Sequence, residues 1–227
     1  MLLLWDIDGT LVEGLGVGRR AMVRTFAKLF GIADAFADIV MSGKVDPSIF
    51  REAVEKNGIE GWPDHLPLIQ ETYLQELAQA MVETPVRINP GILESLNHLR
   101  HKGYLHALGT GNLQQGAHQK MQSCDLLDYF PTGGFADGLF ERNAVIARAK
   151  TTSQRHYNLS ADYPTLVIGD TPRDVEAAHV NGMPCLALAS SRFSVADLQE
   201  VGADWVMEEM DGHRADGMFT QFFASLG

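Results

Sequence analysis

Residues 2–11 read LLLWDIDGTL, an apolar run that ends abruptly on two aspartates, Asp6 and Asp8. A short continuous apolar run bounded by turn residues is typical of a buried β-strand. The pattern recurs twice. Residues 104–112, YLHALGTGN, place Thr110 after an apolar run, and residues 165–174, TLVIGDTPRD, place Asp170 and Asp174 after another.

The rest of the chain alternates strands and helices. Residues 184–188 and 204–207 read as two further strands, and helical stretches separate all of these segments. Such alternation predicts right-handed crossovers and a parallel sheet covered on both faces, an α/β core of the Rossmann-like type. Ligands bind beyond the carboxyl ends of the strands in such sheets, so the polar residues that follow the three runs are expected at one edge.

Helical spacing dominates the stretch between the first strand and residue 86. Met22, Phe26 and Leu29 repeat at helical intervals, and Asp46-Pro47 is typical of a helix start with Asp46 as the N-cap. The sequence therefore predicts a core formed by residues 1–15 and 86–227, with a helical insertion of residues 16–85.

Composition excludes several classes of protein. The 227 residues carry a formal net charge of −11 with only short basic clusters, which argues against a nucleic-acid partner. No apolar run approaches the roughly 20 residues of a membrane helix, and Asp6 interrupts the apolar start too early for a signal peptide. The two cysteines, Cys124 and Cys185, indicate neither a disulfide framework nor a metal motif, so the expected compartment is the cytoplasm.

Carboxylates gathered at one sheet edge repel one another unless a cation neutralises them. Oxygen ligands favour Mg²⁺, which also accepts substrate phosphate oxygens. An aspartate can attack phosphorus and form an aspartyl phosphate, while a second acid protonates the leaving oxygen and then activates water. A small hydroxyl and backbone amides, as at Thr110-Gly111, can hold the phosphoryl oxygens.

The segments Asp6-Ile-Asp8-Gly-Thr-Leu, Thr110 and Gly169-Asp170-Thr-Pro-Arg-Asp174 resemble the motifs of the haloacid-dehalogenase superfamily, in the same order and strand contexts. The chain is similar in particular to phosphatases of the phosphoglycolate-phosphatase-like branch, which have a helical cap. The resemblance implies a Mg²⁺-dependent phosphatase acting on a small phosphorylated metabolite. A dehalogenase would have no use for an acid at Asp8.

Roles follow from the resemblance residue by residue. Asp6 would be the nucleophile and a metal ligand, and Asp8 the general acid/base, with its backbone carbonyl on the metal. Asp170 would bind Mg²⁺ directly. Asp174 would support the metal site without binding the metal directly, or would contact it through a water molecule. Phosphoryl oxygens would be bound by three residues after the second strand: Thr110, Gly111 and Asn112. Asn112 could instead cap the helix that follows it.

The family's usual lysine before the metal motif has no obvious counterpart. Lys150 lies too close to Asp170 and inside a predicted helix, whereas Arg142 lies at the expected start of that helix. We therefore expect Arg142 to replace the lysine; the alternative is a solvated residue at a helix start. Arginine can bind phosphate through two nitrogens but is larger than lysine.

The insertion resembles the family's cap, and the stretch Ser42-Gly-Lys44-Val-Asp-Pro47 resembles the cap loop of phosphoglycolate-phosphatase-like members. Lys44 would contact an anionic group of the substrate, or would be an ordinary surface lysine. Three other functions stay open: a phosphomutase of the β-phosphoglucomutase type, a haloacid dehalogenase, and a non-catalytic phospholigand-binding protein. The sequence does not distinguish a monomer from a homodimer, nor does it identify the substrate.

Overall fold

A computed structural model, which describes residues 1–224, contains a six-stranded sheet in the order β5-β4-β1-β6-β7-β8. Every neighbouring pair in it is parallel, as the alternation of strands and helices predicts. The strands are β1 (Leu2–Trp5), β4 (Leu105–Gly109), β5 (Gly133–Gly134), β6 (Thr165–Gly169), β7 (Cys185–Leu188) and β8 (Trp205–Met207).

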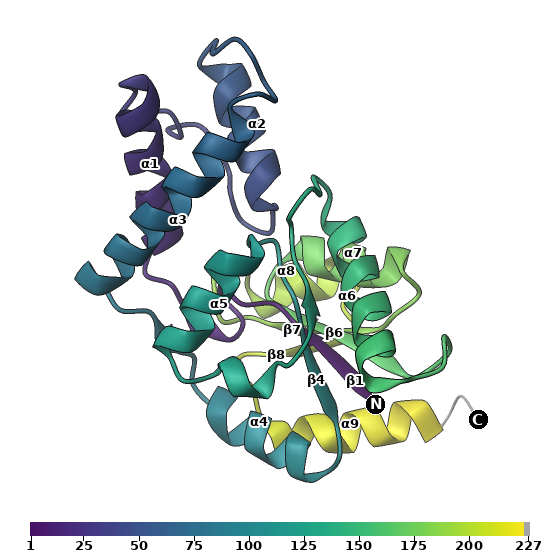
Figure 1. Cartoon of the computed structure of the whole chain (residues 1–227). Helices are drawn as coiled ribbons and strands as arrows, with labels where there is room; N and C mark the ends of the chain where they lie inside the picture. Colours follow the sequence, from purple (N-terminus) through teal and green to yellow (C-terminus); the bar gives the residue numbers. More distant parts are fainter. Residues whose placement is uncertain (225–227) are drawn as a thin grey trace.

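The sheet is buried on both faces, and its strands are mostly apolar, with His106 and Thr165 among the polar exceptions. Along β1, Leu3 and Trp5 pack into one hydrophobic cluster and Leu2 and Leu4 into another, as the period of two in a strand requires. The first cluster is covered by α4 (Ile92–His101), α5 (Gln114–Ser123) and α9 (Gly212–Ala224). The second is covered by α6 (Arg142–Tyr157), α7 (Pro172–Val180) and α8 (Val195–Glu200). The result is a three-layer α/β core (Figure 1).

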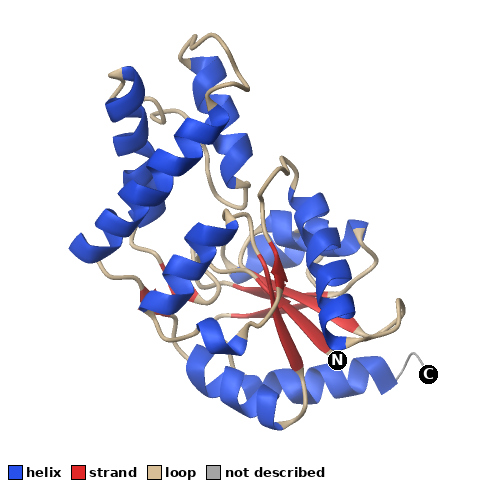
Figure 2. Ribbon diagram, in the orientation of Figure 1, coloured by secondary structure: helices blue, strands red, loops and turns tan. Residues whose placement is uncertain are grey.

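The predicted helical insertion consists of α1 (Val17–Phe30), α2 (Asp46–Lys56) and α3 (Leu66–Glu83). These helices share their own hydrophobic cluster, in which Phe26 and Phe36 meet edge to face. Figure 2 shows them standing beyond one edge of the sheet. The chain leaves the core through β2 (Val12–Glu13) and returns through β3 (Arg87–Ile88), and the two pair antiparallel. The two connections between the core and the insertion therefore lie side by side in this short two-stranded sheet.

The expected start of α2 needs a correction. Asp46 was predicted to cap this helix, but the N-cap is Val45 and Asp46 is the first helical residue. Its carboxylate accepts a hydrogen bond from the Leu113 backbone N–H of the core, at 3.0 Å. The Asp46 carboxylate therefore accepts a hydrogen bond from a backbone N–H of the core and does not cap the first turn of its own helix.

Within residues 1–224, no helix combines the length and the apolar character needed to cross a membrane. The short helix η1 (Leu127–Tyr129) completes the elements of the core.

Candidate active site

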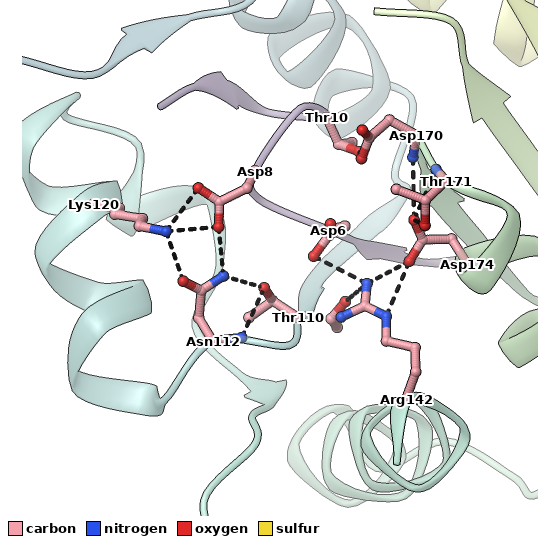
Figure 3. A network of polar contacts seen from close by, with 11 residues as sticks. Asp6, Asp8, Thr10, Thr110, Asn112, Lys120, Arg142, Asp170, Thr171 and Asp174 are labelled. Atoms are coloured by element: carbon pink, nitrogen blue, oxygen red, sulfur yellow. Dashed lines mark hydrogen bonds and ion pairs between the residues drawn. The ribbon is translucent and has the colours of Figure 1, made fainter. Parts of the chain in front are cut away.

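The carboxyl ends of the three central strands bring the predicted polar residues together. Asp6 follows β1, Thr110 follows β4 and Asp170 follows β6, and β1 lies between the other two. All three side chains belong to largely buried residues. Figure 3 shows them around one space, with Asp8 and Asn112 at one end and Arg142 at the other.

The turn after β1 is fastened tightly to the end of β6. Gly9 has a φ of +89°, and a Cβ there would lie 2.2 Å from a carboxylate oxygen of Asp170, so only glycine fits. The Thr10 hydroxyl donates a hydrogen bond to Asp170 at 3.1 Å. The Asn89 amide donates to the carbonyls of Gly9 and Thr10. These contacts explain why glycine and threonine follow Asp8 at this strand end.

Three of the predicted carboxylates form a compact buried group. Asp6, Asp170 and Asp174 each offer an oxygen, and these oxygens lie within 4.8 Å of one another. Burial raises the pKa of Asp6 to about 6, although Arg142 opposes the shift. Burial, with the charges of Asp174 and Asp6, raises the pKa of Asp170 well above its usual range. Crowded, desolvated carboxylate oxygens are a donor set that suits a hard divalent cation.

Arg142 lies where the sequence predicted the replacement for the lysine. It is the first residue of α6 and is only 7% exposed, so the solvated alternative is wrong. Its Nη2 lies 3.0 Å from Asp6 Oδ1. The same guanidinium donates to Asp174 Oδ1 through Nε at 3.0 Å and Nη2 at 2.6 Å, and to the Gly109 carbonyl at 3.0 Å. Arg142 therefore ties the nucleophile candidate to Asp174.

Asp174 uses both of its oxygens on protein groups. Oδ1 accepts from Arg142, and Oδ2 accepts from the backbone N–H of Asp170 and Thr171 and from the Thr171 hydroxyl. The last contacts form a capping box at the start of α7. This arrangement suits a supporting role, in which Asp174 orients Arg142 and the turn at Asp170.

Asp8 points away from Asp6, toward the helix α5 (Figure 3). Its Oδ2 accepts a hydrogen bond from the Asn112 side-chain amide at 2.8 Å, and that amide also donates to the Thr110 hydroxyl at 2.8 Å. Asn112 thus joins two predicted site residues. The alternative role for Asn112 is wrong, because the N-cap of α5 is Leu113 and no side chain caps the helix from that position.

A residue that the sequence reasoning missed completes this end of the site. The Lys120 ammonium donates to Asp8 Oδ1 at 2.7 Å, to Asp8 Oδ2 at 2.6 Å and to Asn112 Oδ1 at 2.7 Å. The surrounding protein desolvates Asp8, which alone raises its pKa, but the charge and hydrogen bonds of Lys120 outweigh this and hold the pKa below its usual value. A signal was present: Lys120 falls on the same helix face as Ala117 and Met121, which face the core.

A pocket of about 470 Å³ lies over this site, lined by core residues such as Asp6, Asp8 and Gly111 and by Lys44, Asp46 and Tyr73 of the insertion. The insertion approaches closely: a Cβ at Gly111 would lie 2.6 Å from the Lys44 carbonyl oxygen. Lys44 is one of the residues that line the pocket, and its ammonium forms an ion pair with Glu52. The Lys44 side chain is partly buried, and its role in binding stays a prediction.

Comparisons with known proteins agree with this architecture. No curated protein matches the chain. Among solved structures, a predicted phosphatase from Clostridium acetobutylicum is 20% identical, with a TM-score of 0.70 over 98% of each chain. CbbY from Rhodobacter sphaeroides, in complex with phosphate, is 19% identical with a TM-score of 0.66, over 92% of this chain and 93% of its own.

A predicted phosphoglycolate phosphatase from Haemophilus somnus is 17% identical, with a TM-score of 0.66 over 92% of this chain and 93% of its own. At these identities the similarity establishes the fold. The family itself is given by a sequence model, described as haloacid dehalogenase-like hydrolase, that matches residues 3–188. The match spans the strand ends that hold Asp6, Thr110 and Asp170, and the chain belongs to the haloacid dehalogenase-like hydrolases.

Proposed function

We propose that this hydrolase is a Mg²⁺-dependent phosphatase that cleaves a small phosphate monoester through an aspartyl-phosphate intermediate. One observation supports this above all others. Asp6 belongs to a buried group of three carboxylates and contacts Arg142. Asp8, two residues later, borders the pocket, and 43% of its side chain is exposed. One carboxylate is thus placed to attack and the other to exchange protons with substrate and water.

The reaction has two halves. An Asp6 oxygen attacks phosphorus and the bond from phosphorus to the ester oxygen breaks. Asp8, which must first take up a proton because Lys120 favours its ionised form, gives that proton to the departing oxygen. Asp8, now ionised, takes a proton from water as that water attacks the phosphorus. The bond between the Asp6 oxygen and phosphorus breaks, which regenerates the Asp6 carboxylate and releases inorganic phosphate. Thr110 and the backbone at Gly111 hold the phosphoryl oxygens in both halves. Arg142 offsets negative charge at Asp6 throughout.

The residues present fit a resident Mg²⁺ ion. Asp6 and Asp170, with the backbone carbonyl of Asp8, would hold it, and Asp174 would orient the group through Arg142 and the Asp170 turn. Bound there, Mg²⁺ supplies positive charge that screens the nucleophile from the phosphoryl oxygens.

The helical insertion, residues 16–85, serves in this proposal as a cap that closes over the pocket and selects the substrate. The narrow β2–β3 connection supports it, as does the contact between the Asp46 N–H and the Gly111 carbonyl, at 2.8 Å. Lys44 and the apolar side chains of Met22, Met41 and Ile49 face the same pocket. We expect a small leaving group with an anionic or polar substituent within reach of Lys44.

The direct test is a screen of small phosphate esters, including phosphoglycolate and sugar phosphates, with Mg²⁺ and with EDTA. We expect phosphate release that requires Mg²⁺ and disappears with EDTA. Asp6→Asn serves as the control for contaminating phosphatases. Transfer of the phosphoryl group within a sugar phosphate, without phosphate release, would indicate a mutase. Halide release from 2-haloacids would indicate a dehalogenase, and no turnover at all would indicate a binding protein.

A further inference from the structure

We propose that Lys120 is a positioning residue that fixes the orientation of Asp8 for proton transfer to the leaving oxygen. The proposal rests on the phosphatase function above and adds a residue to it. Lys120 comes from the helix after β4 and not from the region before the metal motif, where Arg142 lies. Its ammonium contacts Asp8 and Asn112 and does not contact Asp6 among the described interactions.

Hydrogen bonds from Lys120 and Asn112 restrict the orientation of the Asp8 carboxylate. The ammonium contacts both carboxylate oxygens of Asp8, at 2.7 Å and 2.6 Å, and Asn112 donates to one of them at 2.8 Å. The Asn112 carbonyl oxygen accepts from the same ammonium at 2.7 Å, which closes the triangle (Figure 3). A carboxylate held at both oxygens by two partners has little freedom to turn about its last torsion angle.

Burial separates this pair from an ordinary surface ion pair. The Lys120 side chain is 3% exposed, whereas that of Asp8 is 43% exposed and borders the pocket. Desolvating an ammonium is costly, and a methionine of similar length would fill the same space without that cost. The buried lysine is therefore explained by what it does to the pocket-facing carboxylate, since packing alone does not require a charge there.

The two buried cations of the site contact different catalytic carboxylates. Arg142 contacts Asp6 and Asp174, and the described hydrogen bonds of the Lys120 ammonium go to Asp8 and Asn112. Loss of Lys120 should thus leave the attack by Asp6 intact and impair the step that needs Asp8. In phosphoryl transfer to Asp6, that step matters most when the leaving oxygen is strongly basic and departs only with a proton.

The test compares two esters of different leaving ability: the best alkyl phosphate from the screen and p-nitrophenyl phosphate, whose leaving group departs without a proton. The value of kcat/KM is the measurement because it reports the steps up to release of the leaving group. For Lys120→Met we expect a loss of about 10²-fold with the alkyl ester, the scale of general acid catalysis, and little change with the aryl ester. Lys120→Arg, which keeps a cation, should recover part of the loss.

A double-mutant cycle assigns the effect to Asp8. In an Asp8→Asn background, Lys120→Met should change kcat/KM for the alkyl ester little further. Lys28→Met, which removes a lysine paired with Glu76 on the exposed surface of the insertion, is the matched control and should behave as wild type. If Lys120→Met does not fold, as judged by circular dichroism and urea unfolding, Lys120→Gln takes its place.

Two outcomes would overturn the proposal. Equal losses with both esters would mean that Lys120 supports the site as a whole, and a full additional loss in the Asp8→Asn background would mean that it acts elsewhere. A wild-type enzyme that hydrolyses no phosphate ester would refute the phosphatase function itself, and the role of Lys120 would fall with it. If the wild-type enzyme is active and Lys120→Met depends on the leaving group as wild type does, only the role of Lys120 is refuted.

Discussion

Replacing Arg142 with alanine should damage both stability and turnover, and the structure sets the size of each effect. The guanidinium contacts Asp6 Oδ1 at 3.0 Å and Asp174 Oδ1 at 2.6 Å, and all three residues are at most 7% exposed. Removing one partner of a buried ion pair leaves uncompensated charge and costs about 3–5 kcal/mol. We expect urea unfolding of Arg142→Ala, measured without Mg²⁺, to show a loss of that order.

The loss in kcat should be about 10²–10³-fold, the scale of losing a group that stabilises charge in the transition state. Arg142→Lys should retain part of the activity, because one ammonium cannot also reach Asp174 and the Gly109 carbonyl as the guanidinium does. Arg155→Ala is the matched control, an exposed arginine in the last turn of the same helix. Wild-type kcat for Arg142→Ala, with Lys150→Ala inactive, would refute the reasoning, since Lys150 lies by a different pocket beside Tyr163 and His179.

Three other changes have defined outcomes. Asp6→Asn should lower kcat by about 10⁴-fold or more while circular dichroism stays unchanged, because an amide does not attack phosphorus, and a mutant with a tenth of wild-type activity would remove Asp6 from the mechanism. Lys44→Ala should raise KM for anionic esters more than it lowers kcat. Its control is Lys56→Ala, which removes a second, more exposed partner of Glu52, and equal kinetics for both variants would refute a role in binding. Burial raises the pKa of Asp46 from 3.8 to about 7, so its contribution to stability is fully present below pH 4 and is lost as pH rises to 7. Asp46→Asn removes this titrating carboxyl group. The free energy of unfolding of the variant, relative to that of wild type, should therefore rise across this pH range by as much as about 4 kcal/mol in urea unfolding. A stability difference that does not vary with pH would contradict the raised pKa.

The sequence predicted the parts of this molecule whose signals are local. Apolar runs that end on Asp6, Thr110 and Asp170 revealed three strands and the edge at which they meet. The helix start at Arg142 was visible for the same reason, because acidic and glycine residues precede it in the chain. The strand β5, Gly133–Gly134, was not predicted, since two glycines have no side-chain pattern. A Cβ at Gly134 would lie 2.4 Å from the Ala149 backbone nitrogen, so close helix packing selects glycine there.

The residues that were missed or misread depend on partners far away in the chain. Lys120 meets Asp8 across 112 positions, so its place on the buried face of the helix predicts burial but does not identify Asp8 as its partner. Asp46 meets the Leu113 amide across 67 positions, so its local position before a proline suggested a cap that the fold does not use. In both cases the local pattern was read correctly as helix. The role of the side chain was set by tertiary contacts that no local spacing contains.

The charges around the pocket indicate which ligands it binds. Four carboxylates, Asp6, Asp8, Asp170 and Asp174, face two buried cations, and one divalent metal ion would offset the difference. A phosphate monoester then adds about two negative charges that the core alone does not balance. The remaining cations on the pocket wall, Arg19, Lys44 and Arg192, include two from the helical insertion. Binding of an anionic ester should therefore favour the arrangement in which the insertion lies against the core, and an uncharged analogue of the same shape should not.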